Sequence, residues 1–146
     1  MEKKLDEESK ALLRRILERQ AYRQLVAANI RGHALKLVPE IEEKVALIEE
    51  LRHSLAVLRE VERLYAGLGG GNLALAVRDK MEKIPYPATR LELSVCLALC
   101  DRAELAAAGA YSGSACGDMA AIARTLIEQD RASARKGEEM FAAFCA

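Results

Sequence analysis

Hydrophobic residues recur every three or four positions along most of this chain, which is the spacing of one face of an α-helix. The first run begins at Leu5, passes through Leu12 and Leu17, and continues to Ala28. Three later stretches repeat the same spacing. The pattern therefore predicts four long helices, from about residue 5 to the low thirties and over residues 40–66, 90–111 and 116–144.

Local signals mark the ends of these helices. Pro39 suits the first turn of the second helix, because its missing N–H would have no partner there. The glycine run at 67–71 ends that helix at little steric cost. Asn72 is expected to cap a short extra helix, and Thr89-Arg-Leu-Glu92 has the pattern of a capping box for the third long helix.

These elements predict one domain. Helices of about 22 to 29 residues are each near 35–40 Å long, so they can pack side by side along their length. We predict an all-α protein, a single four-helix-bundle domain over residues 1–146 with a short extra helix in the crossover between the second and third long helices. A content of 51% hydrophobic but only 4% aromatic residues, with no Trp, disfavours a β-sandwich or barrel.

Charge and cysteine content narrow the partners and the compartment. Twenty-two basic residues balance twenty-two acidic ones, so we expect no nucleic-acid partner and no binding to an anionic membrane. The chain has no apolar leader and no uncharged stretch of roughly 18 residues, so we expect a cytoplasmic protein without a membrane span. Four cysteines without a C-x-x-C pair are expected to pack as small hydrophobic residues.

Acidic residues fall on the predicted inner faces of the helices, where hydrophobic residues are expected. In the second helix, Glu50 and His53 lie one turn apart on a partly apolar stripe. In the third helix, Asp101 and Glu104 share the inner stripe, and in the first helix Glu18 lies on a mixed face. The inner stripe of the fourth helix comprises Met119, Ala123, Leu126, Asp130, Ser133, Gly137, Met140, Phe141 and Phe144.

Buried carboxylates need a balancing positive charge, because each would otherwise cost several kcal/mol. Two divalent cations would balance four acids, with an imidazole as a neutral nitrogen ligand. Carboxylate and imidazole ligands suit iron or manganese. We therefore predict a centre of two iron ions, or manganese in their place. The predicted ligands are Glu18, Glu50, His53, Asp101 and Asp130, with Glu104 in reserve.

Two other interpretations use the same residues. The Glu-x-x-His spacing arises by chance on many charged helices, and His53 would then be a hydrogen-bonded packing residue. The buried acids would then pair with guanidinium groups instead of metals, and the candidates are Arg52, Arg102 and Arg131.

Parts of the chain resemble a known family. The stretches are Pro85–Leu93, Leu97–Ala103 and Ile122–Glu128, followed by Gly137. They are similar to the ferritin-like di-iron carboxylate superfamily, and within it to the phenylacetic acid catabolic family, which includes the catalytic subunit of phenylacetyl-CoA epoxidase. The resemblance implies a ferritin-like bundle. It places the family's ligands on Glu18, Glu50, His53 and Asp101, and Ser133 stands where the family has a histidine in the fourth helix.

The resemblance implies an oxidoreductase or monooxygenase in which two metals activate O2 for an unknown small-molecule substrate. The alternative is a structural or regulatory ferritin-like subunit with a degenerate metal site, and a third option is a mononuclear or iron-storage protein. We also expect a homodimer or a complex with a partner subunit.

Overall fold

The computed structural model describes residues 5–146, and within this range the regular secondary structure is all α-helix, without a strand. Its five helices are α1 (Glu7–Ala34), α2 (Ile41–Gly67), α3 (Leu73–Met81), α4 (Arg90–Tyr111) and α5 (Gly117–Cys145). The prediction of an all-α protein is confirmed. The four long helices and the short one begin and end close to the predicted residues, because the sequence carries a start or stop signal at each junction.

Three helices begin with the side-chain caps that their sequences supply. Asp6 accepts a hydrogen bond from the backbone N–H of Ser9 at 2.7 Å, and Asn72 accepts one from Leu75 at 3.0 Å. Thr89 Oγ1 accepts from the N–H of Glu92 at 3.1 Å. The Glu92 carboxylate reaches back to the N–H of Ala88 at 2.7 Å, one residue before the cap, which completes the predicted capping box in a slightly longer form.

The junctions around α2 differ in detail from the expectation. Pro39 lies before the cap residue Glu40 and not in the first turn of the helix, so it ends the preceding loop. At the other end, Gly69 has φ +79°, the left-handed conformation that a helix C-terminus commonly needs and that glycine adopts without strain. The glycine run therefore ends α2 as predicted.

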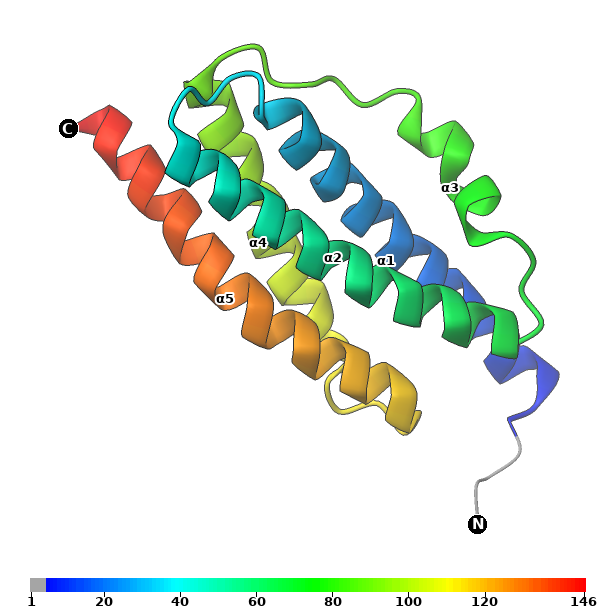
Figure 1. Ribbon diagram of the computed structural model, residues 1–146. Helices are drawn as coiled ribbons and strands as arrows, with labels where there is room; N and C mark the ends of the chain where they lie inside the picture. Colours follow the sequence, from blue (N-terminus) through cyan, green and yellow to red (C-terminus); the bar gives the residue numbers. More distant parts are fainter. Residues whose placement is uncertain (1–4) are drawn as a thin grey trace.

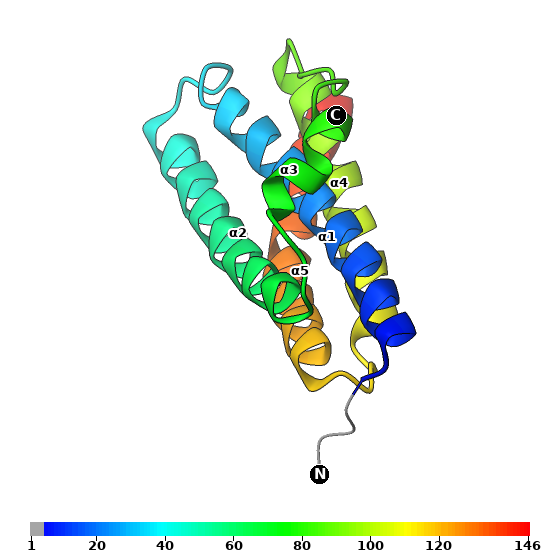
Figure 2. The same cartoon turned by 90° about the vertical axis from the view of Figure 1, so that its right-hand side faces the viewer.

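The four long helices lie side by side, and α3 sits in the connection that leads from the end of α2 back to the start of α4 (Figures 1 and 2). α1 packs against α2, α3 and α4, and α5 packs against α4 and α2. Consecutive long helices α1 and α2 are antiparallel, as are α4 and α5, whereas α2 and α4 run in the same direction. The interior is therefore lined by all four long helices.

The buried interior has two hydrophobic ends and a polar layer between them. One hydrophobic cluster includes Leu17, Val61 and Leu126, and the other includes Leu47 and Leu93. On α2 and α4, inward acids stand between the two groups in the sequence: Glu50 on α2, and Asp101 and Glu104 on α4. The fully buried polar and charged residues are Gln20, Gln24, Arg31, Ser94, Asp101 and Glu104.

Two expectations about individual side chains are wrong. Phe141 is 41% exposed, because it lies beside the inner stripe of α5 and Met140 occupies the half-buried position there. Cys145 is exposed and does not pack in the interior, while Cys96 and Cys100 are half-buried beside the second hydrophobic cluster, where burial raises the pKa of both thiols. The side chain of Phe144 lies outside the described part of the structure.

Within residues 5–146, none of the helices combines the length and the apolar character that a bilayer crossing demands.

Candidate functional site

Arg31 is the centre of the polar layer. Its side chain projects from α1 into the interior, where the residue is only 3% exposed. Its Nη2 donates to Asp101 Oδ1 on α4 at 2.6 Å and to Ser133 Oγ on α5 at 3.1 Å, and its Nε donates to Glu50 Oε2 on α2 at 3.2 Å. One guanidinium therefore joins all four long helices.

Ser133 links the two carboxylates that Arg31 holds. Its Oγ lies 2.8 Å from Asp101 Oδ2 and 3.3 Å from Glu50 Oε2. A hydroxyl has one proton to donate, so at any moment it donates to one of these oxygens, and the shorter distance favours Asp101. The side chain of Lys136 approaches from the solvent side, with Nζ 3.6 Å from Glu50 Oε1. The layer is thus a connected network of two acids, two cations and one hydroxyl.

Arg31 stays protonated in this environment. Burial by itself lowers the pKa of the guanidinium, but the negative charges of Asp101 and Glu50 and their hydrogen bonds outweigh it, and the pKa lies above its ordinary value. Arg31 therefore carries a permanent positive charge between the two carboxylates.

Glu104, one turn after Asp101 on α4, is held by different partners. Its carboxylate accepts a hydrogen bond from Gln20 Nε2, and Arg23 Nε lies 3.6 Å from its Oε2. Burial raises the pKa of Glu104 to about 6, although Arg23 and Gln20 oppose the shift. Glu104 is thus a buried acid bound to α1 and not a solvated surface residue.

Asp130 is the poorly compensated acid of the layer. Its Oδ2 is buried and has no hydrogen-bond partner among the described residues. Burial, together with the nearby charges of Glu104 and Asp101, raises the pKa of Asp130 to about 7, although Arg31 opposes the shift. The carboxyl of Asp130 therefore exchanges its proton near neutral pH.

The predicted inward positions of Asp101, Glu104 and Asp130 are confirmed, but Glu18 lies elsewhere. Glu18 accepts a hydrogen bond from the Tyr65 hydroxyl at 2.8 Å, near the end of α2. It precedes Arg31 by 13 residues on the same straight helix, which is about 20 Å along the axis. Glu18 is therefore not brought together with Glu50 and Asp101.

His53 lies at the margin of the polar layer, where it lines one cavity together with Glu50 and Asp130. Its side chain is exposed, and its Nε2 lies 3.3 Å from Arg52 Nη2. The expectation that His53 shares the inner stripe is wrong. The centre of that stripe is marked by the buried residues Leu47, Val57 and Val61, and His53 lies roughly a quarter-turn around the helix from it. The imidazole therefore stands at the edge of the interior.

The ligand set predicted for two metals is not assembled in this arrangement. Among residues 5–146, no three Asp, Glu, His or Cys side chains lie close enough to hold one ion. The place between Glu50 and Asp101, where a cation would be needed, is taken by the guanidinium of Arg31. The donor set as it stands does not fit a dinuclear centre, and uptake of metal by this chain stays a prediction.

A guanidinium group does pair with the buried acids, but it does not belong to any of the three arginines that the sequence suggests. Arg52 pairs with Glu49 at 3.2 Å and Arg102 with Glu138 at 2.7 Å, all on the surface, and Arg131 is exposed. The signal that identifies Arg31 is the spacing of α1 itself. Its inward positions are Leu17, Gln20, Ala21, Gln24, Ala28 and Arg31, which recur every three or four residues.

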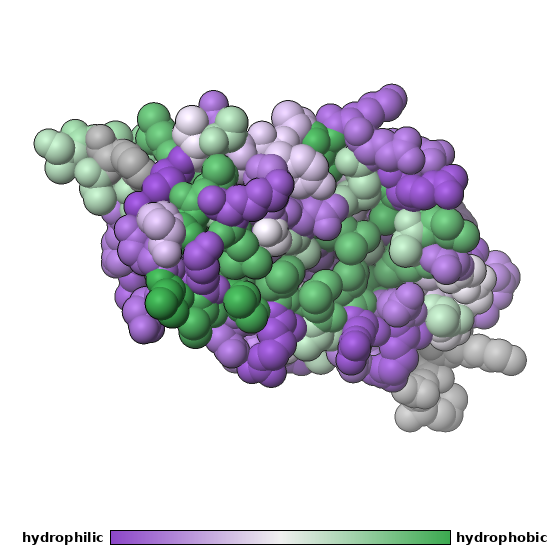
Figure 3. All heavy atoms as spheres, turned by 45° about the horizontal axis from the view of Figure 1, so that its top comes forward, coloured by the Kyte–Doolittle hydropathy of each residue, from purple (hydrophilic) through white to green (hydrophobic). Residues whose placement is uncertain are grey.

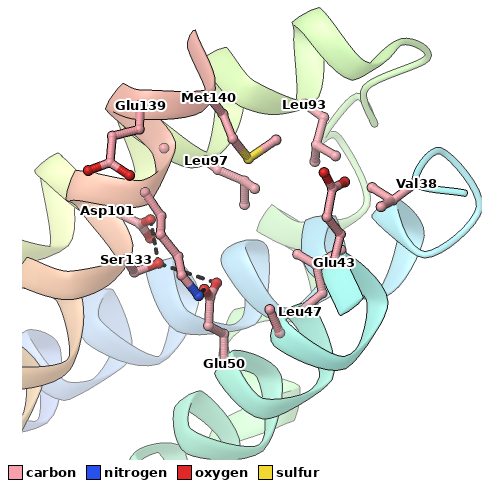
Figure 4. A pocket seen from close by; sticks show the side chains of 13 residues that line it. Val38, Glu43, Leu47, Glu50, Leu93, Leu97, Asp101, Ser133, Glu139 and Met140 are labelled. Carbon is pink, nitrogen blue, oxygen red and sulfur yellow. Dashed lines mark hydrogen bonds and ion pairs between the residues drawn. The ribbon is translucent and has the colours of Figure 1, made fainter. Parts of the chain in front are cut away.

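Two cavities open between α2 and α5, on either side of the contact between Glu50 and Ser133. One has a volume of about 220 Å³ and combines hydrophobic walls with a polar end formed by Glu50, Asp101 and Ser133 (Figure 4). The other has about 350 Å³ and is more polar, with Arg31 and Asp130 in its lining. Small molecules from solvent therefore have two routes to the buried network.

The close packing of α4 and α5 sets the position of Ser133 and Lys136. A Cβ on Gly137 would lie 3.3 Å from the backbone N and Cα of Ala98, so the two helices approach each other closely at this glycine. Gly137 lies on the predicted inner stripe of this helix, and it is buried there. Its physical role here is to bring the preceding turn of α5 up to Asp101.

Comparison with family models, with curated proteins and with solved structures finds no match to this chain. The geometry of the polar layer therefore carries the functional interpretation.

Proposed function

We propose that this chain is a ferritin-like four-helix bundle with a degenerate metal site, and that it acts as a non-catalytic structural or regulatory subunit. The order of the helices supports the assignment of the fold, because two antiparallel pairs joined by a long crossover characterise ferritin-like bundles. The observation that carries the functional proposal is the guanidinium of Arg31 between Glu50 and Asp101.

Arg31 supplies the charge balance that metal ions would otherwise supply. A guanidinium does not lose its proton in proteins, so the balance holds at every physiological pH. A divalent ion between Glu50 and Asp101 would meet this fixed positive charge at contact distance. Metal uptake at this place would require Arg31 to give up the hydrogen bonds of its Nε and Nη2.

Metal analysis tests this proposal. We expect protein purified after expression in iron-supplemented medium to hold far less than one iron per chain, and to consume O2 with added Fe²⁺ no faster than buffer does. A double variant, Arg31→Glu with Ser133→His, supplies an acid and an imidazole beside Glu50 and Asp101 and is expected to gain iron binding. About two irons per unmodified chain would overturn the proposal and restore the di-iron interpretation.

A subunit without catalytic activity needs an interface, and α2 offers one. Ile41, Val45, Ile48 and Leu55 are 42–75% exposed and lie on one face of this helix, at intervals of four, three and seven residues. Hydrophobic side chains also gather on the face drawn in Figure 3, between hydrophilic borders. Contiguous exposed hydrophobic surface of this kind marks interaction sites.

We propose that the stripe of α2 pairs with the same stripe of a second copy, in an antiparallel arrangement. Among the exposed charges along the stripe, Glu42 lies near its start and Arg59 lies beyond its end. Antiparallel pairing brings Glu42 of one copy toward Arg59 of the other.

Light scattering coupled to size exclusion tests this dimer. We expect the unmodified protein to have twice the 16.0 kDa mass of the chain, and Val45→Glu to have the mass of one chain, because a carboxylate would be buried without a partner. Leu99→Glu, at a 64% exposed position of α4, is the control and is expected to leave the dimer intact. A monomeric unmodified protein would contradict the arrangement.

A further inference from the structure

The smaller cavity has the two-part lining of a site for an amphipathic molecule. Its walls are hydrophobic, formed by Val38, Leu47, Leu93, Leu97 and Met140. Its inner end is polar, and Glu50, Asp101 and Ser133 converge there from α2, α4 and α5 in Figure 4. The volume of about 220 Å³ is below the ~300–1,000 Å³ of drug-sized sites, so an occupant would be limited to a single ring or a short chain.

The charges around this cavity favour a cation. Its ionisable lining residues are Glu43, Glu50, Asp101, Glu139 and Lys136. Glu50 and Asp101 share the single charge of Arg31, so their end of the cavity keeps one negative charge. Lys136 balances that charge from the solvent side. An anionic occupant would instead face four carboxylates, of which only Glu43 is paired with a cation outside this network, Arg90 at 2.8 Å.

Lys136 shows which chemical group suits the polar end. Its ammonium lies 3.6 Å from Glu50 Oε1, while its side chain is 61% exposed. A lysine that is mostly in solvent moves away at little cost, because exposed ion pairs contribute about 0–1 kcal/mol. The position that it vacates is then open to another primary ammonium.

We propose that this cavity binds a small organic ammonium, a protonated primary amine with a compact apolar body, which displaces Lys136. The ammonium lies against Glu50 and Asp101, and Ser133 Oγ is available as a further acceptor. The apolar body lies against the walls named above, chiefly Leu47 and Leu97. This inference rests on the proposed function in one respect, that Arg31 and not a metal holds the two carboxylates.

Calorimetric titration of chelator-treated protein at pH 7 tests the proposal with three probes of equal shape: benzylammonium, benzyl alcohol and benzoate. We expect benzylammonium to bind with a dissociation constant below about 1 mM, at least tenfold more tightly than benzyl alcohol. We expect benzoate to give no measurable heat of binding.

Variants of the chain locate the site. Lys136→Gln removes the competing ammonium and is expected to tighten benzylammonium binding several-fold. Glu50→Gln removes the carboxylate that the ammonium contacts and is expected to weaken binding tenfold or more. Lys80→Gln, at an exposed position on α3, is the matched control and is expected to change nothing. The Lys136→Gln substitution removes no buried contact, so this variant should fold and still tests the site if Glu50→Gln does not fold.

Each other outcome overturns the proposal. Equal affinity for the ammonium and the alcohol would mean a purely apolar cavity, and tighter binding of benzoate would mean an anion site at Lys136. No binding, or no response to Lys136→Gln, would exclude this cavity as an ammonium site. Failure of the proposed function is read separately, from the metal content of untreated protein.

Discussion

Replacing Arg31 with methionine is expected to lower the free energy of unfolding by about 3–5 kcal/mol, because it leaves the buried Asp101 and the half-buried Glu50 without their shared cation. Methionine keeps the length and apolar volume of the side chain, so the loss reports the charge and not a cavity. For a domain stable by roughly 5–15 kcal/mol, this is a large fraction of the total. Urea unfolding followed by circular dichroism measures the change.

Two further variants show that the loss comes from the ion pairs. Arg31→Lys keeps the charge but cannot reach three partners with a rigid fork of donors, so we expect a smaller loss. The triple variant Arg31→Met, Glu50→Met and Asp101→Leu removes both orphaned carboxylates and is expected to recover most of the stability. A loss below about 1 kcal/mol for Arg31→Met, the range of an exposed pair, would show that the network is not buried as described.

Replacing Asp130 with asparagine is expected to stabilise the protein by about 1–3 kcal/mol at pH 8, the usual cost of a buried polar group without a partner. At that pH the Asp130 carboxyl, with its pKa of about 7, is mostly ionised among other acids. Asparagine has nearly the same shape, stays neutral and has N–H groups to donate to neighbouring carboxylates. The gain corresponds to a rise in melting temperature of a few degrees.

The pH dependence of this effect has a definite sign. The pKa of Asp130 is higher in the folded state, about 7, than in the unfolded chain, about 3.9. The folded protein therefore binds more protons between these values, and the contribution of Asp130 to stability is complete below pH 4 and is lost as the pH rises through 7. The pKa of Glu104 is also raised, to about 6, so Glu104 makes a contribution of the same sign in the unmodified protein and in Asp130→Asn.

Melting temperatures of the unmodified protein and of Asp130→Asn, measured from pH 4 to pH 8, test the sign of this pH dependence. We expect the curves to lie together near pH 4 and to separate as the pH rises, with Asp130→Asn the more stable protein at pH 8. Glu128→Gln, at an exposed position of the same helix, is the control and should leave the pH dependence unchanged. Parallel curves across the range would show that Asp130 ionises normally in the folded protein.

The location of the polar layer follows in part from the sequence. Asp101, Glu104 and Asp130 lie inward as their helical spacing predicts, because each stands in register with hydrophobic residues on its own helix. His53 has the same kind of signal but lies at the margin of the α2 stripe, where a small rotation of the helix decides between interior and solvent. Sequence spacing resolves the centre of a stripe better than its edge.

Arg31 was missed for a different reason. Its spacing from Leu17 and Ala28 places it on the inner face of α1, but a charged residue at the end of such a stripe is ordinarily assigned to solvent. Its burial depends on the acids that other helices present at the same level. Information of this kind is absent from any single segment of the chain.

The sequence by itself determined where the helices begin and end, that no strand forms in residues 5–146, and which faces of α4 and α5 carry acids inward. These properties depend on caps, glycines and spacing within a few turns, so they are local. The tertiary structure decided which cation balances the acids. That depends on how far α1 is shifted along its axis relative to α2 and α4, which places Arg31 and not Glu18 beside Glu50 and Asp101. Packing among all four long helices sets this register, and a shift of between about three and four helical turns would exchange a guanidinium for a carboxylate at the same point.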